Sequence, residues 1–237
     1  MPWDSAFSYI TFKEYGMKNV TKLLWITVLM AIIGFSFVAC GGGGDHPTII
    51  PHTHNWNLET GVCSGCTDLY YSIGDTGPGG GKIFYRSATS FDGGRHYLEA
   101  DLANIAGDKE WASSSPTDYT NTLISGTFGI VIGTGRTNTA LILGTDANAP
   151  AAKACYASSS GGKGDWFLPS KDELNELYKW YVAGGKGTFG NLNTDYYWTS
   201  TQLTAAAAND QSFFDGSQRT GGGQKSNPAA VRAVRSF

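Results

Sequence analysis

The sequence contains few charged residues and no excess of positive charge. Charged side chains make up 16% of its 237 residues, and the formal net charge is -3. Proteins that hold nucleic-acid phosphates need clustered lysine and arginine, whereas the 17 basic residues of this chain are scattered. We therefore expect no nucleic-acid partner.

Motifs of two common functional classes are also missing. The sequence has no G-x-S-x-G segment, and therefore no nucleophile elbow of the α/β-hydrolase type. The glycine-rich stretch 77–82 departs from a phosphate-binding loop. Thr76 occupies the first glycine position, and Ile83 stands where serine or threonine is needed.

Residues 130–138 match the start of a dinucleotide-binding unit only in part. An apolar segment precedes Gly133 and Gly135, but Asn138 occupies the third glycine position, and no alternating strand–helix pattern surrounds it. A tight turn that leads into a helix explains this segment better. We expect no catalysis and no nucleotide cofactor.

The residues that are abundant indicate one globular domain rich in turns. Hydrophobic residues make up 41% of the sequence and aromatic residues 13%, which is enough for a sizeable core. The 32 glycines follow no G-X-Y period, so a collagen helix is excluded and short elements joined by loops are favoured.

The N-terminal region has the pattern of a cleaved secretory leader. Two lysines precede an apolar run, residues 23–39, that contains no charged residue. A basic segment, an apolar segment and small residues before a cut site are typical of a signal peptide, which we place at residues 17–39. The alternative is an uncleaved membrane anchor, although a run of about 17 residues is short for a spanning helix.

The cysteine that ends this leader separates a lipoprotein from an ordinary secreted protein. Val38, Ala39 and Cys40 resemble the lipobox of bacterial lipoproteins, although Phe37 stands where leucine is usual. The resemblance implies lipidation of Cys40, so that membrane lipid is a partner of the chain. We expect a cell-envelope location, at the outer membrane or cell surface, because Gly41 is not the aspartate of an inner-membrane retention signal.

Met17 is the expected start of translation, and we interpret residues 1–16 as a mis-assigned start. They carry two acidic residues, Asp4 and Glu14, which are unusual at the basic beginning of a signal peptide. After cleavage, residues 40–51 are expected to form a glycine-rich tether that holds the folded part away from the membrane surface.

A small segment, residues 52–72, carries the residue types of a metal site. Cys63 and Cys66 form a C-x-x-C pair, and His52 and His54 precede it. Thiolate and imidazole groups suit zinc, but the two histidines are closer together than usual and the order of the two pairs is reversed. In an oxidising compartment, a disulfide between the two cysteines is the favoured alternative to zinc.

Short runs rich in aromatic and β-branched residues predict strands, and periodic apolar residues predict two helices. The strands are expected at residues 82–85, 96–100, 196–200, 211–215 and 231–237. One helix is expected from Asn138 to Leu143, with a continuation near residues 151–157. Cys155, in that continuation, is expected to be a buried apolar residue.

The clearest helix begins after Ser170. Glu173 stands three residues later, so the pair predicts a capping box that satisfies two backbone N–H groups. Apolar residues then follow at helical spacing, at Leu174, Leu177, Tyr178 and Tyr181. Gly184 and Gly185 are expected to end the helix.

The segment from Gly164 to Leu174, with Trp166-Phe-Leu-Pro-Ser170 at its centre, resembles the signature of the Lcl C-terminal-domain family, named for a bacterial collagen-like adhesin. Supporting segments follow the same order, at residues 73–78, 97–100, 132–135, 138–139, 197–200 and 231–235. The similarity covers residues 73–237. It implies an α+β, C-type-lectin-like fold, with a twisted antiparallel sheet, two helices and long loops.

The resemblance implies binding and not catalysis, with an extracellular glycan or matrix protein as partner. The family's adhesin suggests sulfated polysaccharide, but this chain is not basic and has no collagen repeat. Calcium-dependent lectins use Glu-Pro-Asn or Gln-Pro-Asp tripeptides, which are absent here. The sulfatase-activating enzymes of the broader fold need a cysteine pair within the domain, and only Cys155 follows Cys66.

The residues of the resembling segments also have structural interpretations. Trp166, Phe167 and Trp198 are expected to be core residues. Arg232 and Arg235 fall on opposite faces of a regular strand, so neither face is purely apolar, and we expect an irregular or edge strand there.

Loops rich in glycine, serine and threonine, at residues 113–122, 201–210 and 216–227, are the expected ligand-binding surfaces. The sequence therefore predicts a membrane-anchored, exported lipoprotein with a lectin-like binding or adhesion module. The alternative is a structural envelope lipoprotein without a specific ligand.

Overall fold

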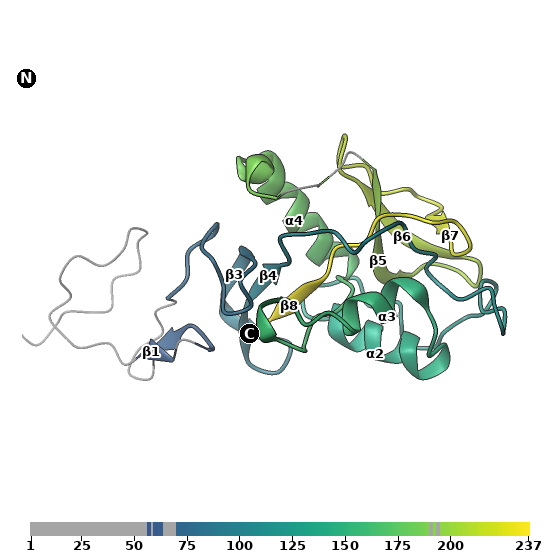
Figure 1. Cartoon of the computed structure of the whole chain (residues 1–237), viewed down its shortest axis with the longest axis horizontal. Coiled ribbons are helices and arrows are strands. Elements are labelled where there is room, and N and C mark those ends of the chain that lie inside the picture. Colours follow the sequence, from purple (N-terminus) through teal and green to yellow (C-terminus); the bar gives the residue numbers. More distant parts are fainter. Residues whose placement is uncertain (1–55, 58, 64–69, 190–191, 193–194) are drawn as a thin grey trace, which may run out of the picture. The chain divides into compact units, whose positions relative to one another are not determined.

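The computed structural model describes residues 56–57, 59–63, 70–189, 192 and 195–237. The expected leader and the tether lie outside these residues. The described part is a mixed α+β domain with two three-stranded antiparallel sheets and three α-helices (Figure 1), which confirms the expected class. Among the described helices, none combines the length and the apolar composition that a membrane crossing requires.

The first sheet joins the beginning of the domain to its end. Its strands are β3 (Lys82–Phe91), β4 (Arg95–Ala100) and β8 (Val234–Ser236), in the order β3-β4-β8. The central strand β4 pairs antiparallel with both neighbours. The last residues of the chain therefore close the sheet that the hairpin β3–β4 begins.

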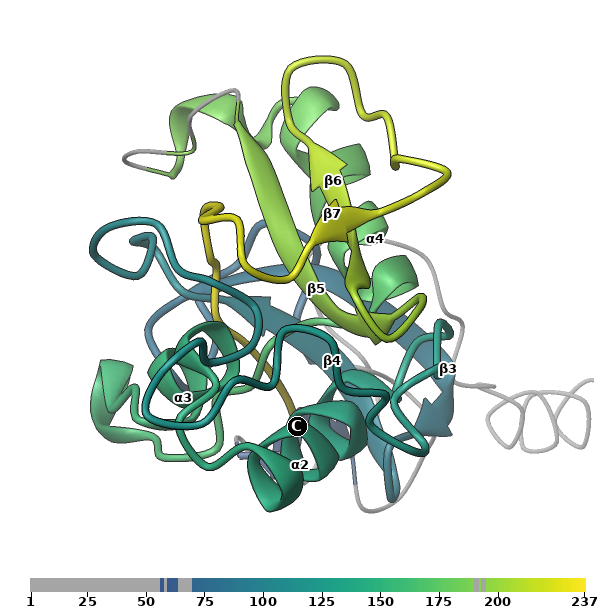
Figure 2. The ribbon, with the colours of Figure 1, turned by 90° about the vertical axis from the view of Figure 1, so that its right-hand side faces the viewer.

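The second sheet contains β5 (Tyr196–Gln202), β6 (Ala207–Ser212) and β7 (Gly223–Gln224), in that order. Figure 2 shows it beside the first sheet, with α2 and α3 on one side. The two sheets replace the single sheet that we expected. A small hairpin, β1 (Trp56–Asn57) and β2 (Val62–Cys63), precedes them.

The helix α4 (Lys171–Val182) begins as its sequence predicts. The Ser170 hydroxyl accepts the Glu173 backbone N–H at 3.3 Å, and the Glu173 carboxylate accepts the Ser170 N–H at 2.7 Å. This is the predicted capping box. Soon after the last turn, Gly184 takes a φ of 138°, a conformation that favours glycine and stops the helix.

The helices α2 (Gly135–Thr145) and α3 (Pro150–Tyr156) are separate, so the expectation of two helices is corrected to three. Asp146 has a φ of -121° and a ψ of 86°, which ends the helical path. Pro150 lacks an N–H group and suits only the first turn of a new helix. The predicted continuation near 151–157 is therefore a new helix.

Three apolar clusters fill the described domain, and the smallest consists of Tyr71, Ile83, Tyr97 and Phe237. The first includes Trp166 and Trp198 and packs among α2, α3 and the second sheet. The second includes Phe167 and packs beneath α4, which contacts β3, β5 and β6. The two tryptophans and Phe167 are buried, as expected, and so is Cys155, whose burial raises the pKa of its thiol.

Two predicted strands differ from the structure. The strand expected at 211–215 lies earlier, as β6, because the buried polar run Asn209-Asp-Gln-Ser212 pairs with β5 despite its low strand propensity. The strand expected at 231–237 is regular only over β8. It lies at the edge of its sheet, in agreement with the two arginines on opposite faces.

Candidate ligand-binding loops

Cys63 is the one member of the expected zinc or disulfide set within the described residues. It ends β2 and is buried. His52, His54 and Cys66 lie outside the described residues, as does Cys40, so zinc, the disulfide and lipidation stay predictions. In the part of the chain that the structure describes, no three His, Cys, Asp or Glu residues are grouped to hold a metal ion.

Two segments form a continuous surface, which we call the loop face and define as residues 113–131 and 203–206. Gln202, at the end of β5, joins them. Its backbone N–H donates to the Thr127 carbonyl at 2.8 Å, and its side-chain oxygen accepts the Ile124 N–H at 3.0 Å. In Figure 1 the segment 113–131 lies toward the end of the domain opposite to β1.

The beginning of the loop face is held by Asp146, which lies between α2 and α3. Its carboxylate accepts the Ser113 backbone N–H at 2.7 Å and the Ser113 hydroxyl at 2.8 Å. It also accepts the Asn148 N–H at 3.1 Å. Because Asp146 is buried, these bonds fix the position of Ser113 relative to the helices.

The middle of the loop face is held by the buried Lys225. Its ammonium donates to the Thr122 carbonyl at 2.7 Å and lies 4.6 Å from the centre of the Trp111 ring. Burial lowers the pKa of Lys225 to about 8. Trp111 is itself fixed by a bond of 2.7 Å from its indole N–H to the Thr199 carbonyl.

The loop face exposes large apolar side chains to solvent, although buried polar groups hold its backbone. Leu123 and Val131 expose 58% and 55% of their surface. The exposed apolar residues of the loop face are Leu123, Phe128, Ile130, Val131 and Leu203. Leu141 of α2, beside Gly126, extends this apolar surface. A cluster of this kind is typical of a surface that binds a partner.

Of the three loops expected to bind ligand, residues 201–210 are corrected most. Thr201 and Gln202 end β5, and Ala207–Asp210 belong to β6, all buried. Only residues 203–206 form a loop. The expected surface loop is therefore wrong for most of this segment, which forms a buried hairpin.

The third expected loop, 216–227, is fixed to β6. Arg219 donates from Nε to one carboxylate oxygen of Asp210 at 3.0 Å and from Nη2 to the other. Its guanidinium lies 4.1 Å from the centre of the Tyr196 ring. Gly222 lies against Leu203, and Lys225 bonds to Thr122. The structure thus brings all three predicted loops together.

The glycine-rich stretch 77–82, which resembles a phosphate loop only superficially, surrounds an internal carboxylate. The backbone N–H groups of Gly79 and Gly81 donate to Glu99 at 3.1 and 2.6 Å. A side chain at Gly77 would lie 2.6 Å from the Glu99 carboxyl carbon. Backbone donors that suit an anion are therefore already occupied by Glu99.

The segment 130–138 makes the expected turn into α2 around another buried carboxylate. Gly133 and Gly135 donate backbone N–H groups to Glu173 at 2.8 and 3.5 Å. These hydrogen bonds lower the pKa of Glu173, but burial has the larger effect and raises it to about 7. This explains the glycine pair without a dinucleotide.

The residues that fix the loop face are not evident from the sequence. Gln202 and Lys225 are polar residues in segments expected to be exposed loops, and Asp146 lies between the expected helix and its continuation. Composition carries no signal that such residues are buried, since their burial depends on partners far away in the sequence.

No known protein family matches this sequence, and no curated protein matches it. A solved structure that it resembles is a fimbrial protein from Bacteroides ovatus ATCC 8483, with a TM-score of 0.42 and 15% sequence identity. The alignment covers 62% of this chain and 37% of the fimbrial protein. The chain therefore spans well under half of that protein.

Proposed function

We propose that this chain is an exported lipoprotein, anchored through acylated Cys40, whose domain binds a glycan or matrix protein through the loop face. The leader, residues 17–39, and the lipobox resemblance support export and lipidation. The absence of the enzyme motifs considered above favours binding over catalysis.

A C-type-lectin-like fold is the finer description that we propose for the α+β domain. The pairing of β4 with the terminal strand β8 supports it, as does the long irregular stretch between β4 and α2. The Trp166–Ser170 segment leads into the capped helix α4, as the resemblance to the Lcl C-terminal domain implies. Loops on a rigid scaffold are where such folds place binding residues.

The combination of exposed apolar side chains and buried polar anchors in the loop face is the observation that carries the proposed binding role. Apolar side chains that protrude from flexible loops lose conformational freedom when they bind. Here Asp146 fixes the backbone at Ser113 and Lys225 fixes it at Thr122 before any ligand arrives. The loop face is therefore preorganised.

A binding array tests this role. The chain without residues 1–44 is applied to immobilised glycans and matrix proteins, beside a Leu123→Ser/Phe128→Ser variant. We expect the variant to lose binding at least about tenfold, because two apolar contacts contribute more than 1.4 kcal/mol. The matched control is Tyr156→Ser/Val182→Ser, which removes two exposed apolar residues outside the loop face.

The control variant is expected to bind like the unchanged chain. Uniform absence of binding on the array would contradict the proposal and favour the structural envelope role. Equal loss in both variants would place the ligand site outside the loop face.

Lipidation is tested by metabolic labelling with a fatty acid. We expect the full chain to incorporate label and a Cys40→Ala variant to incorporate none and to leave the membrane. The control is Cys155→Ala, which removes a buried thiol and leaves labelling unchanged. Membrane retention of unlabelled Cys40→Ala chain would support the uncleaved anchor instead.

A further inference from the structure

Arg232 is a buried arginine whose charge the described residues leave incompletely satisfied. Its side chain is fully buried. One nitrogen, Nη1, donates to the Asp101 carbonyl at 2.6 Å, and the guanidinium lies 5.0 Å from the centre of the Phe189 ring. Among the described residues, neither Nε nor Nη2 has a hydrogen-bond partner.

The unpartnered atoms form one edge of the guanidinium, and other arginines of this molecule use that edge to hold a carboxylate. Arg235 donates from Nε and Nη2 to the two oxygens of Asp165 at 2.8 and 3.1 Å. Arg219 binds Asp210 through the same two nitrogens. This geometry matches a carboxylate with two parallel hydrogen bonds. Within the described residues, no carboxylate binds the same edge of Arg232.

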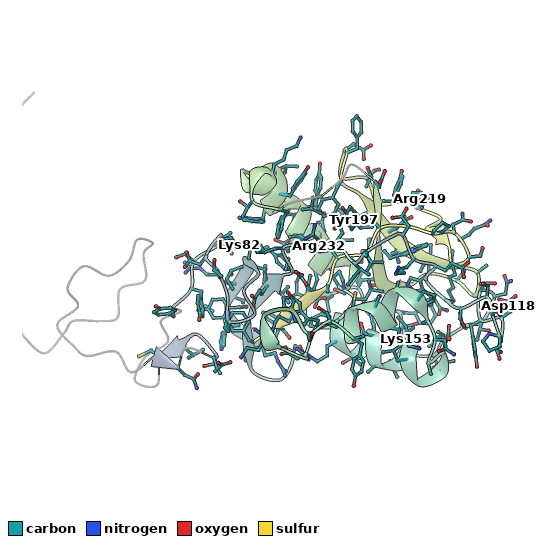
Figure 3. All side chains as sticks on the ribbon, viewed as in Figure 1. Lys82, Asp118, Lys153, Tyr197, Arg219 and Arg232 are labelled. Carbon is teal, nitrogen blue, oxygen red and sulfur yellow. The ribbon has the colours of Figure 1, made fainter. Side chains whose placement is uncertain are left out.

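Polar groups lie near the guanidinium of Arg232. Burial, the largest effect, lowers the pKa of this group to about 10, whereas the nearby Tyr197 phenol raises it through its charge and a weak hydrogen-bond interaction. Asn104 donates from its side-chain nitrogen to the Tyr197 hydroxyl at 2.9 Å. Figure 3 labels Arg232 and Tyr197, which lie next to each other inside the domain.

The Asp101 carboxylate does not form an ion pair with the Nε and Nη2 atoms of Arg232. Its carboxylate acts on the pKa of Arg232 only as a weaker effect than burial, and it accepts the Ala103 backbone N–H at 3.2 Å. A buried cation without an ion pair is unfavourable, so an anion that reaches it gains an unusually strong interaction.

The segment that follows Asp101, whose carbonyl Arg232 binds, reaches the protein surface. Leu102 and Ala103 are exposed, and Asn104 is half-buried. The backbone of this region pairs with the strand-like segment of Arg232, since the Asp101 and Ile105 N–H groups donate to the Ala233 and Val231 carbonyls. Because Asn104 binds Tyr197, which lies near the guanidinium, local opening at residues 102–104 would give a small ligand access to this region while the bonds at Asp101 and Ile105 hold.

We infer that Arg232, with Tyr197 and Asn104 beside it, forms a binding site for a small carboxylate, which two parallel hydrogen bonds from Nε and Nη2 would hold. The site is distinct from the loop face and does not depend on the proposed glycan or matrix ligand. Formate and acetate are the smallest probes with the required pair of oxygens.

The experiment uses the full chain, purified in detergent, and measures its thermal unfolding midpoint in sodium formate or sodium acetate against sodium chloride of equal ionic strength. Because a ligand stabilises the state that binds it, we expect a rise of about 3 °C or more when formate exceeds its Kd about tenfold. An equal rise in chloride would overturn the proposal, since it would show a general ion effect.

An Arg232→Met variant removes the guanidinium and keeps an apolar side chain in the core. We expect it to lose the formate response. The matched control is Arg219→Met, because the same edge of Arg219 is occupied by Asp210 in the structure. That variant keeps the response. A formate response that persists without Arg232 would overturn the site.

A spectroscopic measurement on the unchanged sequence does not depend on whether a variant folds. In chain labelled with 15N at arginine, formate is expected to shift the Nε–H resonance of Arg232 in a saturable way. The Nε–H resonance of Arg235, bound to Asp165, stays in place. A formate concentration of about 0.5 M is enough to fill a weak carboxylate site. If the Arg232 resonance showed no saturable shift up to that concentration, the inference would be contradicted.

Discussion

The Arg235 guanidinium donates from Nη1 to the Glu99 carboxylate at 3.0 Å, and both side chains are buried. Gly79 and Gly81 supply two further backbone donors to the same carboxylate. The ion pair therefore joins β4, β8 and the glycine-rich turn before β3. A buried pair with its remaining hydrogen bonds satisfied is sensitive to the loss of one partner.

Replacing Glu99 by glutamine is expected to lower the free energy of unfolding by about 3–5 kcal/mol. The side-chain NH2 group of the glutamine would face one of the N–H groups that now donate to the Glu99 carboxylate. Arg235 would also lose the buried counter-charge at this position. Urea unfolding measures the change. Glu176→Gln is the control, because Glu176 pairs with Lys179 on the helix surface. This substitution should change the free energy of unfolding by less than about 0.5 kcal/mol. Equal effects of the two substitutions would contradict a special role for the Glu99 pair.

Two glycines of α2 give opposite predictions for the same substitution. A Cβ at Gly135 would lie 2.2 Å from a carboxylate oxygen of Glu173, whereas a Cβ at Gly144 would meet nothing within 4 Å. We expect Gly135→Ala to destabilise the domain by about 2 kcal/mol or more. Gly144→Ala should stabilise it by about 0.5–1 kcal/mol, because alanine favours the helix.

Thermal or urea unfolding of both alanine variants distinguishes these effects. If Gly135→Ala proved neutral, the close approach of Glu173 to the start of α2 would be wrong. The pair also shows why glycine content alone is ambiguous: one glycine is required by packing, and the other is merely tolerated.

Local sequence signals predicted the elements whose causes are local. The capping box of Ser170 and Glu173 placed the start of α4, and the aromatic run from Tyr196 placed β5. In both cases the determining residues lie within one turn or one strand. The burial of Trp166 and Trp198 followed from their size and apolar surface.

What could not be predicted depends on contacts distant in the sequence. Asp210 and Gln211 are poor strand residues, yet they are buried in β6 because Arg219 and the neighbouring strand satisfy them. Asp146 is likewise buried with the help of a distant residue, because Ser113, 33 residues earlier, supplies two of its donors. Nothing in the sequence indicated that Arg232 is buried, since arginine is almost never fully buried unless it is paired.

The pKa of Glu173 predicts a pH dependence of stability. Burial raises this pKa from 4.5 to about 7, with the Asp92 carboxylate acting in the same direction and backbone N–H groups opposing. The folded state therefore favours the protonated acid. Its contribution to stability is fully present below pH 4.5 and is lost as the pH rises through 7, by up to about 3 kcal/mol.

Urea unfolding from pH 4.5 to 8 measures this dependence. The Glu173→Gln variant cannot ionise at this position, so its stability should fall less steeply with pH than that of the unchanged chain. Asp172→Asn, one residue earlier in the same turn, keeps the original slope. A pH profile that is identical in the Gln variant and the unchanged chain would show that Glu173 does not titrate in this range.

Asp146 links the stability of the domain to the order of the loop face. Asp146→Ala leaves the Ser113 N–H and hydroxyl without their buried acceptor. We expect a loss of about 2–4 kcal/mol in the free energy of unfolding. Amide hydrogen exchange in residues 113–122 should become at least about tenfold faster relative to exchange in β4, because the anchor of this segment is gone.

Asp215 provides the matched control, since its carboxylate also accepts a backbone N–H and a hydroxyl from one serine, Ser217, but at an exposed turn. Asp215→Ala should leave both stability and exchange at residues 113–122 almost unchanged, because water replaces the lost acceptor at once. If Asp146→Ala lowered stability but left exchange in 113–122 unaltered relative to β4, the segment would be held by other contacts. Ligand affinity would then not depend on Asp146, and preorganisation of the loop face would have to come from Lys225 and Gln202.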